Sequence, residues 1–211
     1  MRLPNGIWVS TPNPPRFEGK PGLILDRDGV MVRETHYLRD PAKVALMPGL
    51  GALMAWARQQ GMALACATNQ SGIARGLISW PDFEAVEAEI TRQLARVGHH
   101  LDLTLACPFH PDFPGPAPED EARWRKPGPA MIERILTETG IDPARSWLIG
   151  DKKSDIEAAR AAGLAGAIHV ATGHGATERD TLSAGTASFI VLHADDLFQA
   201  LRLLQAEIPQ A

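Results

Sequence analysis

The sequence predicts an α/β protein with a doubly wound parallel sheet. Short, continuously apolar segments alternate with amphipathic segments of helical periodicity along most of the chain. Several apolar segments end in aspartate or threonine, which is typical of parallel strands whose carboxyl ends form a binding crevice. The 211 residues, 45% of them hydrophobic and 22% charged, suffice for one soluble domain with a large core.

This single domain is expected to span residues 23–211, preceded by an extended arm over residues 1–22. Five prolines in the arm exclude a regular helix or a central strand. They leave room for a short edge strand at 7–9.

The first buried strand is predicted at 23–26 and leads into Asp26, Asp28 and Gly29. Two carboxylates this close repel each other, which favours a hard divalent cation such as Mg²⁺ between them. An acidic turn after a strand would give the same pattern, so the pair needs partners from elsewhere in the chain.

The middle of the chain predicts a lid, two strands and two helices. Residues 29–48 form a long loop directly after the first strand, which is typical of a functional lid. Strands are predicted at 62–67 and 101–106, the first of them followed by a polar stretch at 68–76 that could bind phosphate oxygens or be an ordinary loop. The first helix has an apolar stripe of Leu50, Leu53, Met54 and Ala57. The second helix starts at Ser79, and its apolar stripe is Phe83, Val86, Ile90, Leu94 and Val97.

The second half of the chain continues the alternation after an irregular, proline-rich loop at 108–122. Arg125 and Lys126 are expected at the start of a helix and could hold an anionic group. Further strands are predicted at 147–151, 167–171 and 188–192. Three helices are predicted between and after these strands. Their inward-facing residues are Met131, Ile132, Ile135 and Leu136 in the first, and Ile156 and Ala159 in the second. The third helix is capped by Asp195 and has Leu197, Leu201 and Leu204 on its inner face.

Polar residues at these predicted strand and helix ends form a set that can transfer a phosphoryl group. The set comprises Asp26, Asp28, Thr68, Lys126 and Asp151, which converge if the strands are parallel. One carboxylate can attack phosphorus and form an aspartyl-phosphate, and a second can protonate the leaving alkoxide. A divalent cation with lysine and threonine donors would stabilise the negative charge on the phosphoryl oxygens.

The four motifs resemble those of the haloacid dehalogenase-like (HAD) phosphatases over nearly the whole chain. Leu25–Gly29 resembles their first motif, Thr68 the second, Lys126 the third, and 150–155 the fourth. The resemblance implies a Rossmann-like fold with a minimal loop cap, Asp26 as nucleophile and Asp28 as acid and base. It also implies Mg²⁺ bound by Asp26, Asp151 and the backbone carbonyl of Asp28, with Asp155 close behind.

Within this family the sequence is most similar to the D-glycero-D-manno-heptose-1,7-bisphosphate 7-phosphatase branch, which has the histidinol-phosphate phosphatases as near relatives. The segments that carry this similarity are Asp26–Gly29, Thr68–Gly76, Cys107-Pro108 and Arg125–Pro127. A small phosphorylated metabolite, in particular a sugar bisphosphate, is the substrate that this resemblance implies. The implied substrate contacts are Glu34, Thr35, His36, Tyr37, Asn69, Gln70, Ser71, Arg125 and Lys152.

One departure from that branch concerns a structural zinc site. Many members bind zinc through Cys-x-His and a later Cys-x-Cys just before Arg-Lys-Pro. The corresponding positions here are Cys107 and Phe109, then Ala122 and Trp124, so three of the four ligands are replaced. One ligand is too few for a closed structural site. We therefore expect no zinc, with Phe109 and Trp124 filling the space through apolar contacts.

The composition limits the partners and the compartment that can be expected. The formal charge of −4 does not indicate binding to nucleic acid or to acidic membranes. Cys66 and Cys107 lie in apolar segments and form no disulfide framework, which fits a reduced, cytoplasmic compartment. No stretch has the length of a signal peptide core or a membrane-spanning helix. A monomer is the expected state.

Two other classes of protein would share part of the pattern. A signalling receiver domain uses an acceptor aspartate, acidic metal ligands, a hydroxyl residue and a lysine, but its acidic pair and acceptor lie on different strands. Here Asp26 and Asp28 are two residues apart. A catalytically inactive phosphate-binding protein of the same fold is the other alternative, and it is disfavoured because every expected catalytic residue is present.

Overall fold

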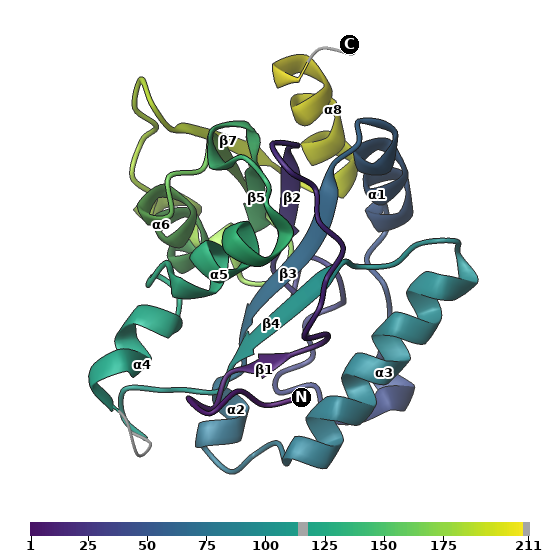
Figure 1. The fold of residues 1–211 in the computed structure, drawn as a ribbon, viewed down its shortest axis with the longest axis vertical. Helices are drawn as coiled ribbons and strands as arrows, with labels where there is room; N and C mark the ends of the chain where they lie inside the picture. Colours follow the sequence, from purple (N-terminus) through teal and green to yellow (C-terminus); the bar gives the residue numbers. More distant parts are fainter. Residues whose placement is uncertain (114–117, 209–211) are drawn as a thin grey trace.

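The computed structural model describes residues 1–113 and 118–208, which form the predicted α/β fold around a seven-stranded sheet (Figure 1). The strand order is β1-β4-β3-β2-β5-β6-β7, and only β1 runs antiparallel to its neighbour. The strands are β1 (Trp8–Val9), β2 (Gly22–Leu25), β3 (Ala63–Asn69), β4 (Leu103–Cys107), β5 (Trp147–Gly150), β6 (Gly166–Val170) and β7 (Ile190–Ala194).

The order of the strands reverses direction between β2 and β5. The chain proceeds from β2 to β3 and β4 on one side, and then returns to β5, β6 and β7 on the other. A switch of this kind leaves a crevice beyond the carboxyl ends of the two strands. Asp26 and Asp151 directly follow these two neighbouring strands, so the topology brings them to the same crevice.

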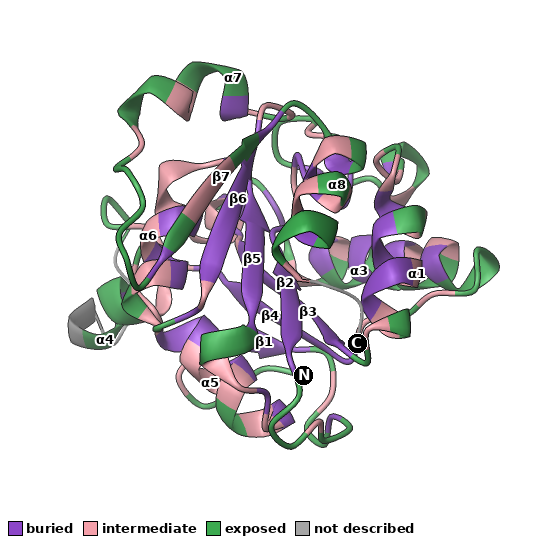
Figure 2. Cartoon of the chain, turned by 90° about the horizontal axis from the view of Figure 1, so that it is seen from above, coloured by how far each residue is buried: buried purple, intermediate pink, exposed green. Residues whose placement is uncertain are grey.

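Helices cover both faces of the sheet (Figure 2). On one face lie α1, α3 and α8, and on the other lie α5 and α6. The helices are α1 (Leu50–Gln59), α2 (Ser71–Ala74), α3 (Trp80–Arg96), α4 (Pro118–Trp124), α5 (Ala130–Thr139), α6 (Lys153–Ala161), α7 (Gly175–Glu178) and α8 (Leu197–Glu207), with short 3₁₀ helices at Pro41–Lys43, Pro143–Arg145 and Arg179–Thr181.

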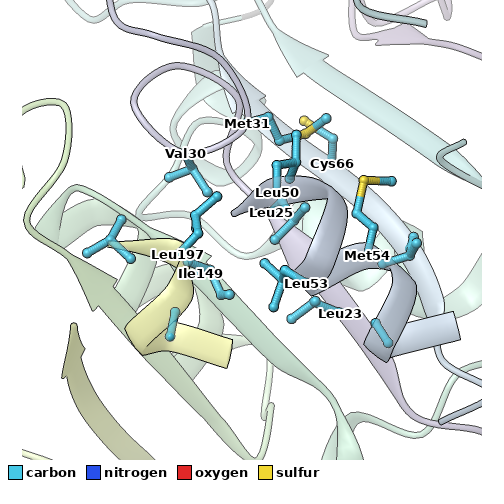
Figure 3. Close-up of a cluster of buried hydrophobic side chains, with 14 of the residues drawn as sticks. Leu23, Leu25, Val30, Met31, Leu50, Leu53, Met54, Cys66, Ile149 and Leu197 are labelled. Carbon is cyan, nitrogen blue, oxygen red and sulfur yellow. The ribbon is translucent and has the colours of Figure 1, made fainter. Parts of the chain in front are cut away.

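Two core clusters fill the space between the sheet and its helices. The first core cluster, which includes Leu25, Leu53 and Leu197, lies under α1 and α8 (Figure 3). The second core cluster contains Ile24 of β2 and packs under α5 and α6. Because successive residues of β2 enter opposite clusters, the strand has no exposed face. This explains its continuously apolar sequence.

Helix α3 begins as predicted but ends earlier than its apolar stripe suggests. The Ser79 hydroxyl accepts a hydrogen bond from the Asp82 backbone N–H, and the Asp82 carboxylate accepts one from the Ser79 backbone N–H. This reciprocal capping box stabilises the first turn. The helix ends at Arg96, so Val97, expected to face inward, is instead 55% exposed.

Several other predicted boundaries are corrected by the structure. Helix α8 is capped by Asp196 rather than Asp195, because the Asp196 carboxylate accepts the Gln199 backbone N–H. Strand β4 begins two residues later and ends one residue later than predicted, and β7 lies two residues later. Part of the irregular loop expected at 108–122 forms α4, while residues 114–117 lie outside the described residues. Lys126 is not at a helix start but between α4 and α5.

The arm at 1–22 contacts the rest of the chain along its length. Within it, β1 pairs with β4, in agreement with the short edge strand expected at 7–9. Farther on, the Phe17 and Gly19 backbone N–H groups donate to the carbonyls of Thr139 and Gly140. No helix within residues 1–113 and 118–208 combines the length and the hydrophobicity that a membrane crossing requires.

Candidate active site

Asp26 lies at the end of β2 in contact with a buried lysine. The Lys126 ammonium donates to Asp26 Oδ1 at 2.7 Å and to the Ala67 carbonyl at 2.6 Å, and it pairs with Asp155 Oδ1 at 2.5 Å. All three residues are at most 5% exposed. Burial disfavours the charged lysine, but the two carboxylates outweigh it and raise the pKa of Lys126. Lys126 therefore stays cationic between two buried acids.

Three buried carboxylates could share a cation with Lys126 beside them. Asp26, Asp151 and Asp155 each offer an oxygen, and these atoms all lie within 4.8 Å of one another. Asp151 Oδ1 is buried and has no hydrogen-bond partner among the residues that the structure describes. Burial, and then the charge of Asp26, raise the pKa of Asp151 to about 8. Three carboxylates stand close together here with Lys126 between them, and one of their oxygens has no hydrogen-bond donor in the described part of the chain. A hard divalent cation, which prefers oxygen ligands, fits such a site.

The structure also builds a tight cradle around the Asp151 carboxylate. Gly29 and Gly173 both have left-handed backbone conformations, with φ of 87° and 58°. A Cβ atom at Gly29 would lie 2.6 Å from Asp151 Oδ2, and one at Gly173 would lie closer still. The His174 backbone N–H donates to the same Oδ2 at 2.8 Å, which directs the second oxygen toward the carboxylate cluster. Only glycine fits at both positions.

Asp28, the predicted acid and base, is held by side chains from two elements. The guanidinium of Arg27 donates to both Asp28 oxygens at 2.9 to 3.1 Å. Gln70 Nε2 donates to Asp28 Oδ2 at 2.7 Å and also contacts the Thr68 hydroxyl at 2.9 Å. The Gln70 side chain thereby links the loop after β2 to the end of β3.

A cavity of about 270 Å³ lies against most of these residues, although Asp151 and Arg27 are not among those that line it. Eleven of the residues predicted for the site line it: Asp26, Asp28, Glu34, His36, Tyr37, Thr68, Asn69, Gln70, Ser71, Lys126 and Lys152. The sequence therefore predicted most of the residues that surround this cavity.

The lid segment reaches the cavity through an unusual backbone. His36 and Tyr37 both adopt positive φ angles, 56° and 61°, which non-glycine residues rarely do. The Glu34 carboxylate accepts the His36 backbone N–H at 2.7 Å, which supports this turn. Tyr37 packs against Gly72, where an added Cβ would lie 2.8 Å from its ring. The segment is thus docked on the polar stretch after β3.

Two predicted substrate contacts lie outside this cavity. Thr35 lines an adjoining groove of about 460 Å³ together with Arg39 and Lys43. Arg125 lines a separate cavity of similar size, which shares Lys126 with the main one. The Arg125 guanidinium donates to the Phe109 carbonyl at 2.9 Å, and burial lowers its pKa.

Sequence reasoning missed His174 and Ser154, which also line the main cavity. His174 Nε2 lies 3.7 Å from the Glu34 carboxylate, so the loop after β6 meets the lid across the cavity. The available signal was its position after a buried parallel strand, where crevice residues are expected. Asp155, expected close behind the metal ligands, offers an oxygen within 4.8 Å of those of Asp26 and Asp151.

The positions that correspond to zinc ligands in related proteins have a largely apolar environment. Cys107 is fully buried, and burial raises the pKa of its thiol to about 12. Phe109 and Trp124 are partly buried and pack against the second core cluster. Ala122 lines the same cavity as Phe109 and Arg125.

Comparison with known proteins identifies relatives over most of the chain. A HAD-hydrolase-like family model matches residues 123–197. A D-glycero-beta-D-manno-heptose-1,7-bisphosphate 7-phosphatase from Mesorhizobium japonicum is 37% identical over 164 residues, 76% of this chain and 74% of the relative. A D-glycero-D-manno-heptose-1,7-bisphosphate 7-phosphatase from Chlorobaculum tepidum is 36% identical over 185 residues, 85% of this chain and 91% of the relative.

Solved structures agree with these sequence matches. A protein from Mesorhizobium loti described as a HAD-like phosphatase superimposes with a TM-score of 0.82 and 33% identity, covering 95% of this chain and 92% of its own. A D,D-heptose 1,7-bisphosphate phosphatase from B. bronchiseptica, complexed with magnesium and phosphate, gives a TM-score of 0.74 and 31% identity, covering 89% and 99%. The chain therefore belongs to the HAD-like phosphatase family that includes the D-glycero-D-manno-heptose-1,7-bisphosphate 7-phosphatases.

Proposed function

We propose that this protein is a Mg²⁺-dependent phosphatase that removes the 7-phosphate of D-glycero-D-manno-heptose 1,7-bisphosphate. The observation that carries the proposal is the cluster of Asp26, Asp151, Asp155 and Lys126 in the crevice between β2 and β5. It is supported by relatives of that name that are 36 to 37% identical to this chain.

The first step transfers the phosphoryl group to Asp26. Lys126 donates to Oδ1, which leaves Oδ2 to attack phosphorus and form an aspartyl-phosphate. Burial raises the pKa of Asp26, and the charge of Lys126 opposes that rise and favours the carboxylate. As the bond from phosphorus to the sugar oxygen breaks, Asp28 passes its proton to the leaving alkoxide.

The second step returns Asp26 to its carboxylate form. A water molecule attacks phosphorus and gives up a proton to Asp28, and the bond between phosphorus and Asp26 breaks to release inorganic phosphate. The Thr68 hydroxyl, which lines the cavity, would donate to a phosphoryl oxygen, and Asn69 holds the Lys126 backbone in place through paired hydrogen bonds.

A divalent cation would be held by Asp26, Asp151 and the backbone carbonyl of Asp28, with Asp155 adjacent. When bound, it supplies positive charge that offsets the repulsion between the nucleophile and the phosphate. Asp151 Oδ1, buried and without a hydrogen-bond partner in residues 1–113 and 118–208, is the atom best placed to bind it.

We expect the stabilisation by Mg²⁺ to increase with pH up to about 8. Without a cation, the raised pKa of about 8 means that folded Asp151 keeps a proton that the unfolded chain loses near its ordinary value of about 4. The folded state then binds more protons, so this group makes the protein less stable as pH rises between those values. Mg²⁺ displaces that proton and removes the penalty.

Thermal melts with saturating Mg²⁺ and with a chelator, at pH 6 and pH 8, measure this effect. The difference in Tm between the two conditions should be larger at pH 8, and Asp151→Asn should remove most of it. A difference that is equal at both pH values would show that Asp151 does not hold the displaced proton.

The substrate assignment is tested by phosphate release from heptose 1,7-bisphosphate, histidinol phosphate and simple sugar monophosphates. We expect the bisphosphate to give the highest kcat/KM. Arg125 lines a neighbouring cavity that shares Lys126 with the main one, so it would bind the second phosphate there, and Arg125→Ala should lower kcat/KM by about 10-fold or more for the bisphosphate alone. Arg123→Ala is the matched control, since Arg123 is an exposed neighbour paired with Glu133. Preference for histidinol phosphate, or equal losses on all substrates in Arg125→Ala, would reject this assignment.

A further inference from the structure

A buried chain of charges connects helix α3 to Asp28. Arg27 is only 1% exposed, and its guanidinium donates to Glu87 Oε1 through Nη1 at 2.8 Å. Its other nitrogens, Nε and Nη2, contact the Asp28 carboxylate. Glu87 lies in the middle of α3 and is itself 8% exposed, although it belongs to none of the motifs that define the site. The order is therefore Glu87, Arg27, Asp28.

The Arg27 guanidinium has contacts on every side. Nη2 also donates to Gln70 Oε1 at 2.9 Å, and the ring of Phe83 lies 5.6 Å from the guanidinium carbon. Burial alone would lower the pKa of Arg27, but the carboxylates of Asp28 and Glu87 outweigh it and raise that pKa. Arg27 thus stays charged, with one carboxylate toward the cavity and one behind it.

A buried ion pair of this kind is weak evidence for a role in stability. Replacing a buried ion pair with apolar residues of similar volume is often neutral or stabilising. The first core cluster already includes Val86 and Ile90, the neighbours of Glu87 on the buried side of α3. What the buried pair adds is geometry, because a planar guanidinium holds a carboxylate in one orientation.

We propose that Glu87 is a positioning residue that acts through Arg27 to hold the Asp28 carboxylate in place for proton transfer. This inference rests on the proposed function, in which Asp28 is the acid and base. Glu87 anchors Nη1, so Nε and Nη2 face Asp28 in a fixed direction. Without that anchor the guanidinium and Asp28 can rotate together, and proton transfer requires a donor within hydrogen-bond reach of the leaving oxygen.

The two chemical steps depend on Asp28 in different ways. In the first, Asp28 gives its proton to the leaving oxygen as the phosphorus–oxygen bond breaks, which matters for a basic alkoxide and hardly for dinitrophenolate. In the second, Asp28 takes a proton from the attacking water whatever the leaving group was. Because kcat/KM reports only on steps up to leaving-group departure, a mispositioned Asp28 lowers kcat/KM for alkyl phosphates but not for 2,4-dinitrophenyl phosphate.

The test compares Glu87→Leu, which removes the acceptor for Arg27 Nη1, with the wild type on a sugar phosphate and on 2,4-dinitrophenyl phosphate. We expect kcat/KM for the sugar phosphate to fall about 10- to 100-fold, while that for the activated ester changes less than about 3-fold. Stopped-flow traces with the activated ester should show a burst of dinitrophenolate, because the aspartyl-phosphate accumulates when its hydrolysis is slow. Glu84→Leu is the matched control, because Glu84 lies one turn earlier on α3 and is exposed, and its carboxylate accepts from Trp8 Nε1 rather than from Arg27.

A second variant protects the test against loss of folding. The double substitution Arg27→Met with Glu87→Leu removes both buried charges and retains apolar volume, and it should give the same dependence on leaving group. Equal losses on both substrates, or no loss on either, would overturn the inference. A wild-type protein without Mg²⁺-dependent turnover of either ester would instead reject the proposed function itself.

Discussion

Asp26→Asn is expected to lower kcat for phosphate release by at least about a thousand-fold, because an amide cannot serve as the nucleophile that forms the phosphoryl intermediate. The substitution should not weaken the fold. Lys126 Nζ can still donate to the amide oxygen in place of Asp26 Oδ1, and one of three clustered negative charges disappears. We therefore expect a Tm equal to or above that of the wild type in the absence of divalent cations.

Phosphate release and thermal melts of the same preparations separate the two effects. Asp195→Asn is a suitable control, because this aspartate is 76% exposed on its side chain and lies outside the cavity. Turnover by Asp26→Asn at the wild-type rate would argue against an aspartyl-phosphate mechanism. A large drop in Tm with unchanged chemistry would make Asp26 a structural residue.

The carboxylates of the site were predictable because strand polarity determines where they lie. An apolar segment that ends in aspartate marks the carboxyl end of a buried parallel strand, and all such ends in one sheet face the same edge. This is why Asp26 and Asp151, far apart in sequence, could be expected to lie together before their strands were known to be neighbours.

Contacts that cross between elements were harder to predict. Helix α4 was missed because proline usually indicates irregular structure, although it is tolerated at a first helical turn. Glu87 lies four residues after Phe83 and three before Ile90, in the middle of an apolar stripe. An acid at such a position implies a buried partner, but periodicity alone does not say that the partner is Arg27.

Lys126→Met is expected to destabilise the fold by about 3 to 5 kcal/mol in the absence of divalent cations, because removing one partner of a buried ion pair leaves the other charge unpaired. Lys126 contacts both Asp26 and Asp155, so both carboxylates would lose their cation. Activity should fall by about 100-fold or more, since a donor beside the reacting phosphoryl group is lost. Lys153→Met is the matched control, because the Lys153 side chain is 43% exposed and pairs at 3.6 Å with Glu157.

A double variant with Lys126→Met and Asp26→Asn tests whether unpaired charge causes the destabilisation in Lys126→Met. If the destabilisation comes from unpaired carboxylates, the double variant will be more stable than the sum of the single effects predicts, by about 0.5 to 3 kcal/mol in chemical denaturation with a chelator present. Saturating Mg²⁺ should restore part of the stability of the single variant for the same reason, because a cation replaces the missing ammonium. If the effects instead add, lost packing of the lysine stem explains the destabilisation, since that stem is buried whether or not Asp26 carries a charge.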